Sequence, residues 1–271
     1  MKRPLVIFLA LLLSLGAAAQ PDTTGRYAGL DSLLTQFYLA LEHEETPAKN
    51  AEFDALIASC HDSLTRQHVA LSVFDHYRFS RIMGEESVAM HIYDEWIAPG
   101  KVETRSEFEL FEAERFSLEN RNTLLGMTAP KVTLRKVCGA RKTIPADGRI
   151  SVLFFYSPGC AKCRLETYAL PAVLDQVEFP MNFYAVDVDT DRQAWKAFRK
   201  ALKTSNRNVR MIQLWDPDQD SDLLLQYGVF STPKVFVAME DGEIIGRRLE
   251  MENLQQIIQY INILYGQEKE E

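Results

Sequence analysis

One short segment, residues 151–164, constrains the fold of this chain more than any other. It reads SVLFFYSPGCAKCR, so β-forming residues run into a Ser-Pro-Gly break and then into Cys160 and Cys163, which have Cys-x-x-Cys spacing. This order predicts a buried strand, a turn and the start of a helix. The unpaired N–H groups and the dipole of a helix N-terminus favour a thiolate at Cys160. A thiolate with a second cysteine one turn away has the minimum equipment for thiol–disulfide exchange.

The amino terminus predicts export. Lys2 and Arg3 precede an apolar run at residues 5–13, and residues 16–19 are small. A positive start, a short apolar run and a small-residue cleavage site are typical of a secretory signal peptide, which we place at residues 1–19. The run is short for a membrane span, although an uncleaved anchor remains the alternative. We expect the mature protein in the periplasm or cell envelope.

Composition limits the class of protein and its partners. The chain has 271 residues, of which 46% are hydrophobic, and a formal net charge of -8. The length predicts two globular domains. The acidic balance argues against nucleic acid or an anionic membrane as a partner. Four cysteines in so long a chain do not indicate a disulfide-stapled scaffold.

The first domain, residues 20–121, is predicted to be all-α. Apolar residues recur at helical spacing in three stretches, residues 30–41, 53–64 and 88–96, and the third stretch stops at a Pro-Gly pair. Thr104 with Glu107 three residues later resembles a capping box for a further helix. We find no catalytic constellation in this half of the chain.

The second domain, residues 122–266, alternates strand and helix patterns and is followed by an acidic tail, residues 267–271. Helices are predicted at four places, and Pro171 is expected to break or kink the first: residues 160–177, 191–203, 220–227 and 252–265. Strands are predicted at residues 132–137, 150–156, 183–188, 211–215, 234–239 and 244–249. This order predicts an α/β fold with a mixed sheet covered by helices.

Three features together resemble the thioredoxin superfamily: Cys-Ala-Lys-Cys at residues 160–163 after a buried strand, the loop GVFSTP at residues 228–233, and the terminal hairpin and helix. The extra helix and strand at residues 191–215, with Cys-Arg-Leu-Glu at 163–166, resemble the exported TlpA/ResA branch of that superfamily. The resemblance covers residues 122–265. The helical half is similar to the leader of thioredoxin-like proteins from the Bacteroides group.

The resemblance implies an enzyme that reduces or exchanges disulfides in other exported proteins and is regenerated by a membrane-linked thiol reductant, without a bound cofactor. Cys160 would attack the substrate disulfide and Cys163 would resolve the mixed disulfide. Thr232 and a cis Pro233 would offer backbone groups to a substrate chain. Lys162 is expected to lower the pKa of Cys160 further, because it adds positive charge. Glu166 is either a proton carrier or a solvated helix residue.

Some residues depart from the superfamily's pattern. Thioredoxin has a buried aspartate six residues before its first cysteine, where this chain has Phe154. The acid that moves a proton from the resolving cysteine is therefore missing or supplied elsewhere. For Cys60 a buried inert thiol is favoured, and its pairing with Cys138 stays open.

A second hypothesis is a thioredoxin-like binding or sensing module without enzymatic activity, whose cysteine pair is structural or binds a metal. A zinc site commonly uses paired ligand motifs, and the sequence has neither a second Cys-x-x-Cys nor a His-x-x-x-His. The predicted active residues therefore include no metal ligand.

Overall fold

The computed structural model describes residues 25–268, so the predicted signal peptide and most of the acidic tail lie outside the described residues. The chain divides into two compact units, Met1–Glu114 and Arg115–Glu271. The division falls within helix α6, Glu107–Asn120, whereas the sequence placed the domain boundary between residues 121 and 122. No helix in the described part of the chain is long and apolar enough to cross a membrane.

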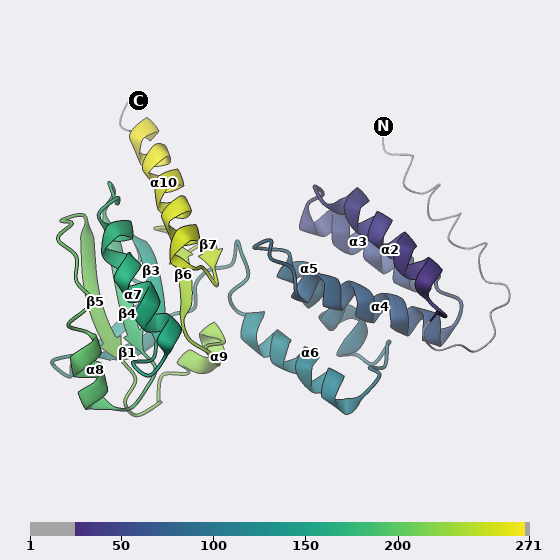
Figure 1. The fold of residues 1–271 in the computed structure, drawn as a ribbon, viewed down its shortest axis with the longest axis horizontal. Coiled ribbons are helices and arrows are strands. Elements are labelled where there is room, and N and C mark those ends of the chain that lie inside the picture. Colours follow the sequence, from purple (N-terminus) through teal and green to yellow (C-terminus); the bar gives the residue numbers. More distant parts are fainter. Residues whose placement is uncertain (1–24, 269–271) are drawn as a thin grey trace. The chain divides into compact units, whose positions relative to one another are not determined.

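The first unit is helical, as predicted (Figure 1). Its elements are α2 Ala28–Leu41, α3 Thr46–Ser59, α4 Ser63–Arg78, α5 Glu86–Ile92, the short π-helix η1 Tyr93–Ile97 and the first half of α6. Its core contains aromatic side chains in edge-to-face contact, with Phe53 at 0% exposure between Phe37 and Tyr77. These contacts join α2, α3 and α4 into one packed body.

Two local predictions in this unit were wrong. The apolar pattern of residues 53–64 spans two helices, because Asp62 caps α4 by accepting a hydrogen bond from the Thr65 N–H at 2.9 Å. The cap of α6 lies two residues after Thr104. There the Ser106 hydroxyl accepts from the N–H of Glu109 at 3.2 Å, and the Glu109 carboxylate accepts from the N–H of Arg105 at 2.6 Å.

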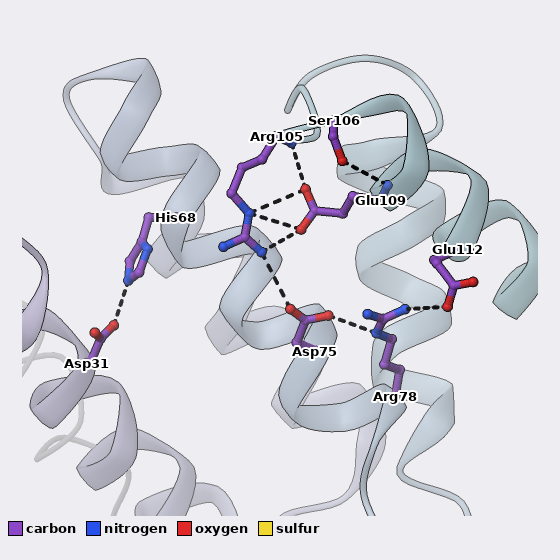
Figure 2. Close-up of polar contacts among 8 residues, drawn as sticks. All are labelled: Asp31, His68, Asp75, Arg78, Arg105, Ser106, Glu109 and Glu112. Atoms are coloured by element: carbon purple, nitrogen blue, oxygen red, sulfur yellow. Dashed lines mark hydrogen bonds and ion pairs between the residues drawn. The ribbon is translucent and has the colours of Figure 1, made fainter. Parts of the chain in front are cut away.

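Charged side chains connect α4 to the start of α6 (Figure 2). Arg105 contacts Glu109 at 2.5 Å and Asp75 at 3.6 Å, and Asp75 also pairs with Arg78 at 2.8 Å. Arg78 in turn reaches Glu112 at 4.0 Å. Acids and bases thus alternate along this network, so each charge has an opposite charge beside it.

The second unit contains a mixed seven-stranded sheet among the described residues, in the order β2-β1-β5-β4-β3-β6-β7. Its strands are β1 Val132–Lys136, β2 Arg141–Ile144, β3 Ile150–Tyr156, β4 Met181–Asp187, β5 Val209–Trp215, β6 Lys234–Ala238 and β7 Ile244–Arg247. Strands β3, β4 and β5 are parallel, and the other pairs are antiparallel. The sequence missed β2, because this strand reads RKTI and buries one residue fully.

Helices cover both faces of the sheet, which confirms the predicted α/β class (Figure 1). Side chains of α7 Ala161–Leu174, α8 Arg192–Phe198 and α10 Met251–Glu268 pack on one face, and α9 Leu223–Tyr227 packs on the other. Pro171 was predicted to break or kink this helix; a break does not occur, because α7 continues through Pro171 to Leu174. Beyond the proline the helical bonds resume, with the Asp175 N–H donating to the Pro171 carbonyl at 2.9 Å.

Candidate functional site

The two cysteines lie where β3 ends and α7 begins. Cys160 is the N-cap residue of α7, and its Sγ accepts the N–H of Cys163 at 3.0 Å. The two residues form a disulfide with their Cα atoms 5.2 Å apart. Strand, break and helix fold here as the segment predicts, because the β-forming run is fully buried and the helix starts directly after the break. When the pair is reduced, the same N–H and the helix dipole favour a thiolate at Cys160.

The two sulfur-bearing residues differ in access to solvent. Cys163 is 0% exposed and packs in the core between the sheet and α7, whereas Cys160 is half-buried. An incoming disulfide therefore reaches Cys160 first. Cys163 is placed to act only on its neighbour within the chain.

The loop before β6 lies against Cys160. The Thr232 carbonyl oxygen is 3.3 Å from the Cys160 Sγ, and the Thr232–Pro233 peptide bond is cis. Antiparallel pairing of β6 with β3, in which Lys234 lies opposite Phe155, holds this loop at the end of β3. Since proline has no N–H, the backbone at this point offers acceptors. The structure thus brings Thr232 together with Cys160, as the sequence predicts.

Behind this loop lies the end of α6. Lys234 is 5% exposed, and its ammonium donates to the Gly228 carbonyl and lies 3.6 Å from the Glu119 carboxylate. Burial lowers the pKa of Lys234 to about 8, although Glu119 acts in the opposite direction. Gly228 has a φ of +57°, and a Cβ there would meet the Glu119 backbone. The loop is therefore supported by α6 at close range.

Two basic side chains beside the cysteines have partners of their own. Lys162 donates to Glu250 at 2.6 Å, and this hydrogen bond lowers the pKa of the exposed Glu250 carboxyl. Arg164 donates to the carbonyls of Pro158 and Gly159 at 3.1 and 3.4 Å. Arg164 therefore braces the turn that precedes Cys160, and Lys162 links α7 to the residue before α10.

Glu166 forms a helix cap. Its Oε2 accepts the N–H of Met251 at 3.1 Å, which is the first residue of α10. This contact satisfies one of the unpaired N–H groups at that helix start. The sequence had suggested a proton carrier or a solvated helix residue at Glu166. The structure instead shows a contact that positions the start of α10.

A buried carboxyl that sequence reasoning missed lies at the end of β4. Asp187 is 0% exposed, its Oδ1 accepts the Asp189 N–H at 2.9 Å, and its Oδ2 has no hydrogen-bond partner. Burial raises the pKa of Asp187 to about 7. Residues alternate between faces along a strand, so Asp187 shares its face with Phe183 and Ala185. Those two residues pack in the same core as Cys163.

Asp187 also has a polar neighbour on β3. Its register partner is Tyr156, whose hydroxyl is buried without a hydrogen-bond partner and whose pKa is raised, first by burial and then by Asp187. Two unsatisfied polar groups thus lie on neighbouring strands, Tyr156 at the end of β3, which precedes Cys160, and Asp187 at the end of β4. The sequence signal for these two residues was a polar side chain as the last residue of an otherwise largely apolar strand.

The remaining cysteines are both free and lie in different units. Cys60 is half-buried at the end of α3, where its Sγ contacts the Leu56 carbonyl at 3.5 Å and burial raises its pKa. Cys138 is exposed in the turn between β1 and β2.

Within residues 25–268, no group of His, Cys, Asp and Glu could hold a metal ion. Cavities of about 600 and 180 Å³ lie elsewhere in the second unit, and neither cysteine of the pair lines them. Exposed apolar side chains do accompany the site, namely Leu165 and Tyr168 on α7 and Phe230 in the loop before Thr232.

Comparison with solved structures gives the fold. A thioredoxin-like protein from Bacteroides caccae superposes with a TM-score of 0.66 at 13% identity, covering 88% of this chain and 87% of that one. A thioredoxin domain of a thiol-disulfide oxidoreductase from Bacteroides vulgatus covers 51% of this chain and 96% of its own, with a TM-score of 0.45 and 21% identity. StoA from Bacillus subtilis covers 47% and 96%, with a TM-score of 0.37 and 19% identity. No protein-family model matches the sequence, and no curated protein matches it either.

Proposed function

Because the chain superposes over 88% of its length on a thioredoxin-like protein from Bacteroides caccae, we propose that it is a thiol–disulfide oxidoreductase. One observation carries this proposal: the Sγ of the partly buried Cys160 lies at a helix N-terminus, 3.0 Å from the Cys163 nitrogen and 3.3 Å from the Thr232 carbonyl oxygen, while Cys163 is fully buried. An accessible sulfur stabilised as a thiolate, with a buried partner, is the arrangement that disulfide exchange requires.

The exchange has two steps. The Cys160 thiolate attacks one sulfur of the substrate disulfide, whose S–S bond breaks and releases a substrate thiolate. Cys163 then loses its proton and attacks the Cys160 sulfur, which releases the second substrate thiolate and forms the Cys160–Cys163 disulfide. The substrate gains the two electrons that the cysteine pair loses. A thiol reductant outside the chain must return the pair to its dithiol state.

The surface around Cys160 favours a protein substrate. The disulfide lies outside the two cavities, and large apolar side chains are exposed on the neighbouring elements, with Tyr168 at 85% and Leu165 at 69% exposure. An extended segment would find backbone acceptors at Thr232, while Pro233 leaves its own position free of a donor.

Asp187 accepts the proton of the resolving Cys163, a role that Phe154 cannot fill at the position of thioredoxin's buried aspartate. A carboxyl with a pKa of about 7 accepts and returns a proton near neutral pH. Asp187 faces the core that contains Cys163, and its Oδ2 is not occupied by another donor. Glu166 is a weaker candidate, because its carboxylate already accepts the Met251 N–H.

The cellular setting is part of the proposal. The signal-peptide pattern at residues 1–19 supports export to the periplasm or cell envelope, where disulfides form and need reduction or exchange. The clients would be disulfide-containing exported proteins, as in the TlpA/ResA branch that the sequence resembles, and a membrane-linked thiol reductant would regenerate the pair. Fractionation of cells, with the mature N-terminus read by mass spectrometry, tests this: a chain that begins at Gln20 supports cleavage.

Activity is tested with single cysteine variants. Reduction of a fluorescent disulfide substrate by the protein and dithiothreitol should fall to the uncatalysed rate in Cys160→Ser. Cys163→Ser should instead accumulate a mixed disulfide. A Cys60→Ser/Cys138→Ser variant is the control and should keep full activity. A fully active Cys160→Ser variant would refute the enzyme and leave the binding-module hypothesis.

The reduction potential of the Cys160–Cys163 pair gives the direction of electron flow. In a variant with Cys60 and Cys138 replaced by alanine, we expect a value near that of thioredoxin, about −270 mV. A value near about −120 mV would mean that the protein donates disulfides, contrary to the reductase proposal.

A further inference from the structure

The sheet has an open stretch of strand edge. Strand β1 pairs with β5 only at its end, where Arg135 lies opposite Trp215 and Lys136 opposite Leu214. The chain then turns away into β2. Among the described residues, the part of β5 from Val209 to Gln213 therefore has β4 as its strand neighbour on one side and no strand on the other.

The backbone of this stretch is available for pairing. In a parallel strand, alternate residues direct their N–H and C=O groups to opposite sides. The Asn208 carbonyl accepts from the Met181 N–H of β4 at 2.9 Å, so the even-numbered residues face β4. The N–H and C=O groups of Met211 and Gln213 consequently face the open side. Such an edge is a template for an added strand.

A cavity of about 600 Å³ lies along this edge. Residues 136–138 at the end of β1, Arg199 after α8 and residues 210–213 of β5 line it. These elements enclose the space that a continuation of β1 would fill. The open edge is thus hollowed and reachable from solvent.

Cations without counter-ions surround the cavity. Lys136, Arg199 and Arg210 form no ion pair with any described residue. By contrast, two arginines on the β1–β2 hairpin, which also contains Lys136, are paired: Arg135 with Asp218 and Arg141 with Asp220. The contrast matters because the chain as a whole carries an excess of acids, with a formal net charge of -8.

These cations lie on both faces of the sheet. Lys136 shares a face with its register partner Leu214, and alternation puts Arg210 on that same face. Lys142 joins them, since its pKa is lowered by burial and then by Lys136 and Arg210. Arg199 belongs to the opposite face, where its carbonyl accepts from the Gln213 side chain at 3.0 Å.

We propose that the open edge of β5 binds an extended acidic segment of a partner protein as an additional strand. Its backbone pairs with Met211 and Gln213, and its alternating side chains place carboxylates against Lys136 and Arg210 on one face and Arg199 on the other. A second copy of this chain does not fit, because pairing of two such edges would bring the same cations together. The site is separate from the disulfide and holds whether or not the chain is an oxidoreductase.

Fluorescence anisotropy with the full chain tests the proposal. The probe is a rhodamine-labelled peptide EETVTEE, blocked at both ends. We expect it to bind, and to bind roughly tenfold more weakly to Lys136→Gln/Arg210→Gln, because two exposed charge contacts are lost. Lys196→Gln/Lys203→Gln removes the same charge from exposed positions that do not line the cavity and should bind as wild type does.

Two further measurements separate strand pairing from simple charge attraction. A peptide with its central valine N-methylated keeps its charge but loses a backbone donor, so it should not bind. Amide exchange at Met211 and Gln213 should slow when the unmodified peptide is present. Absent binding of EETVTEE, equal binding of the methylated peptide, or equal loss in both double variants would overturn the proposal.

Discussion

A buried lysine in the helical unit and a buried aspartate in the sheet unit lie in different surroundings. In the helical unit, Lys49 is 5% exposed, and its ammonium donates to Glu85 at 2.8 Å and to the Glu42 carbonyl at 3.2 Å. In the sheet unit, Asp187 is 0% exposed and has no cation among its hydrogen-bond partners, and one of its oxygens has no partner. Burial with no cation beside it raises the pKa of Asp187 to about 7, so this carboxyl changes its protonation near neutral pH.

The same difference appears at the surface. Figure 2 shows acids and bases alternating across the helical unit, where Arg105 lies between Glu109 and Asp75. The cations around the open edge of β5 have no such partners. The charges of this network thus stabilise the helical unit itself. The sheet unit has ion pairs of its own and, besides them, a buried carboxyl without a cation and a strand edge with unpaired cations.

Phe53→Ala probes the stability of the helical unit and should have the largest effect. Phe53 is 0% exposed and contacts Phe37 and Tyr77, so its truncation should destabilise the helical unit by about 3–5 kcal/mol. Urea unfolding followed by circular dichroism measures this, with exposed Leu39→Ala as a near-neutral control. Disulfide exchange under native conditions should be unchanged. A parallel loss of exchange would contradict the separation of roles.

Asp187→Asn tests the unpaired buried carboxyl. Because its pKa is raised from 3.8 to about 7, the folded state binds more protons than the unfolded state between those values. Stability should therefore fall as pH rises from about 4 to about 7, by up to about 4 kcal/mol in total. The asparagine variant should lose this decline, while exchange at neutral pH should slow. A wild-type profile that stays flat over this interval would contradict the assignment.

A matched control for Asp187 lies in the same unit. Asp216 is also buried, but its two oxygens accept hydrogen bonds from Ser221 and from the Asp220 N–H. Asp216→Asn should keep the wild-type decline of stability with pH, even where it lowers overall stability.

Two helix caps, one in each unit, should give smaller and similar effects. Asp62→Ala removes the acceptor for the Thr65 N–H, and Glu166→Ala removes the acceptor for the Met251 N–H. Each should cost about 1 kcal/mol in thermal unfolding. Glu166→Gln should recover most of that loss, because an amide oxygen also accepts. If it recovers stability but not exchange activity, the carboxylate does more than cap α10.

Arg105→Gln should have the smallest effect. Its side chain is 55% exposed, so loss of its contacts with Glu109 and Asp75 should cost less than about 1 kcal/mol. The free energy of unfolding of both proteins at low and high salt measures this loss. The loss should be smaller at high salt, because salt screens the ion pairs of the wild-type protein. A cost that salt does not change would mean that the network in Figure 2 acts through packing.

The sequence predicted what depends on local pattern. The run before the cysteines forms β3, and the Cys-x-x-Cys segment forms the start of α7. Both could be predicted because the signals for a buried strand and for a helix start lie within a few consecutive residues. The proximity of Thr232 to Cys160 followed from the resemblance to thioredoxin-like proteins.

What the sequence could not predict depends on contacts between distant segments. Glu166 caps a helix that begins 85 residues later, and Asp187 is buried on the sheet face on which α7 and α8 pack. Strand β2 is visible only as the partner of β1, because its own residues are mostly polar. Such features follow from tertiary packing, which overrides local propensity.

The close approach of α6 to the loop before β6 sets where the chain can be divided. A fragment that begins at residue 122, at the predicted domain boundary, would lack Glu119 and leave the buried Lys234 without its carboxylate. It would also empty the space beside Gly228, where the backbone of α6 now lies. A fragment that begins at Arg115 keeps both contacts. The second half of α6, which the sequence assigns to the helical domain, therefore supports the loop of the sheet unit.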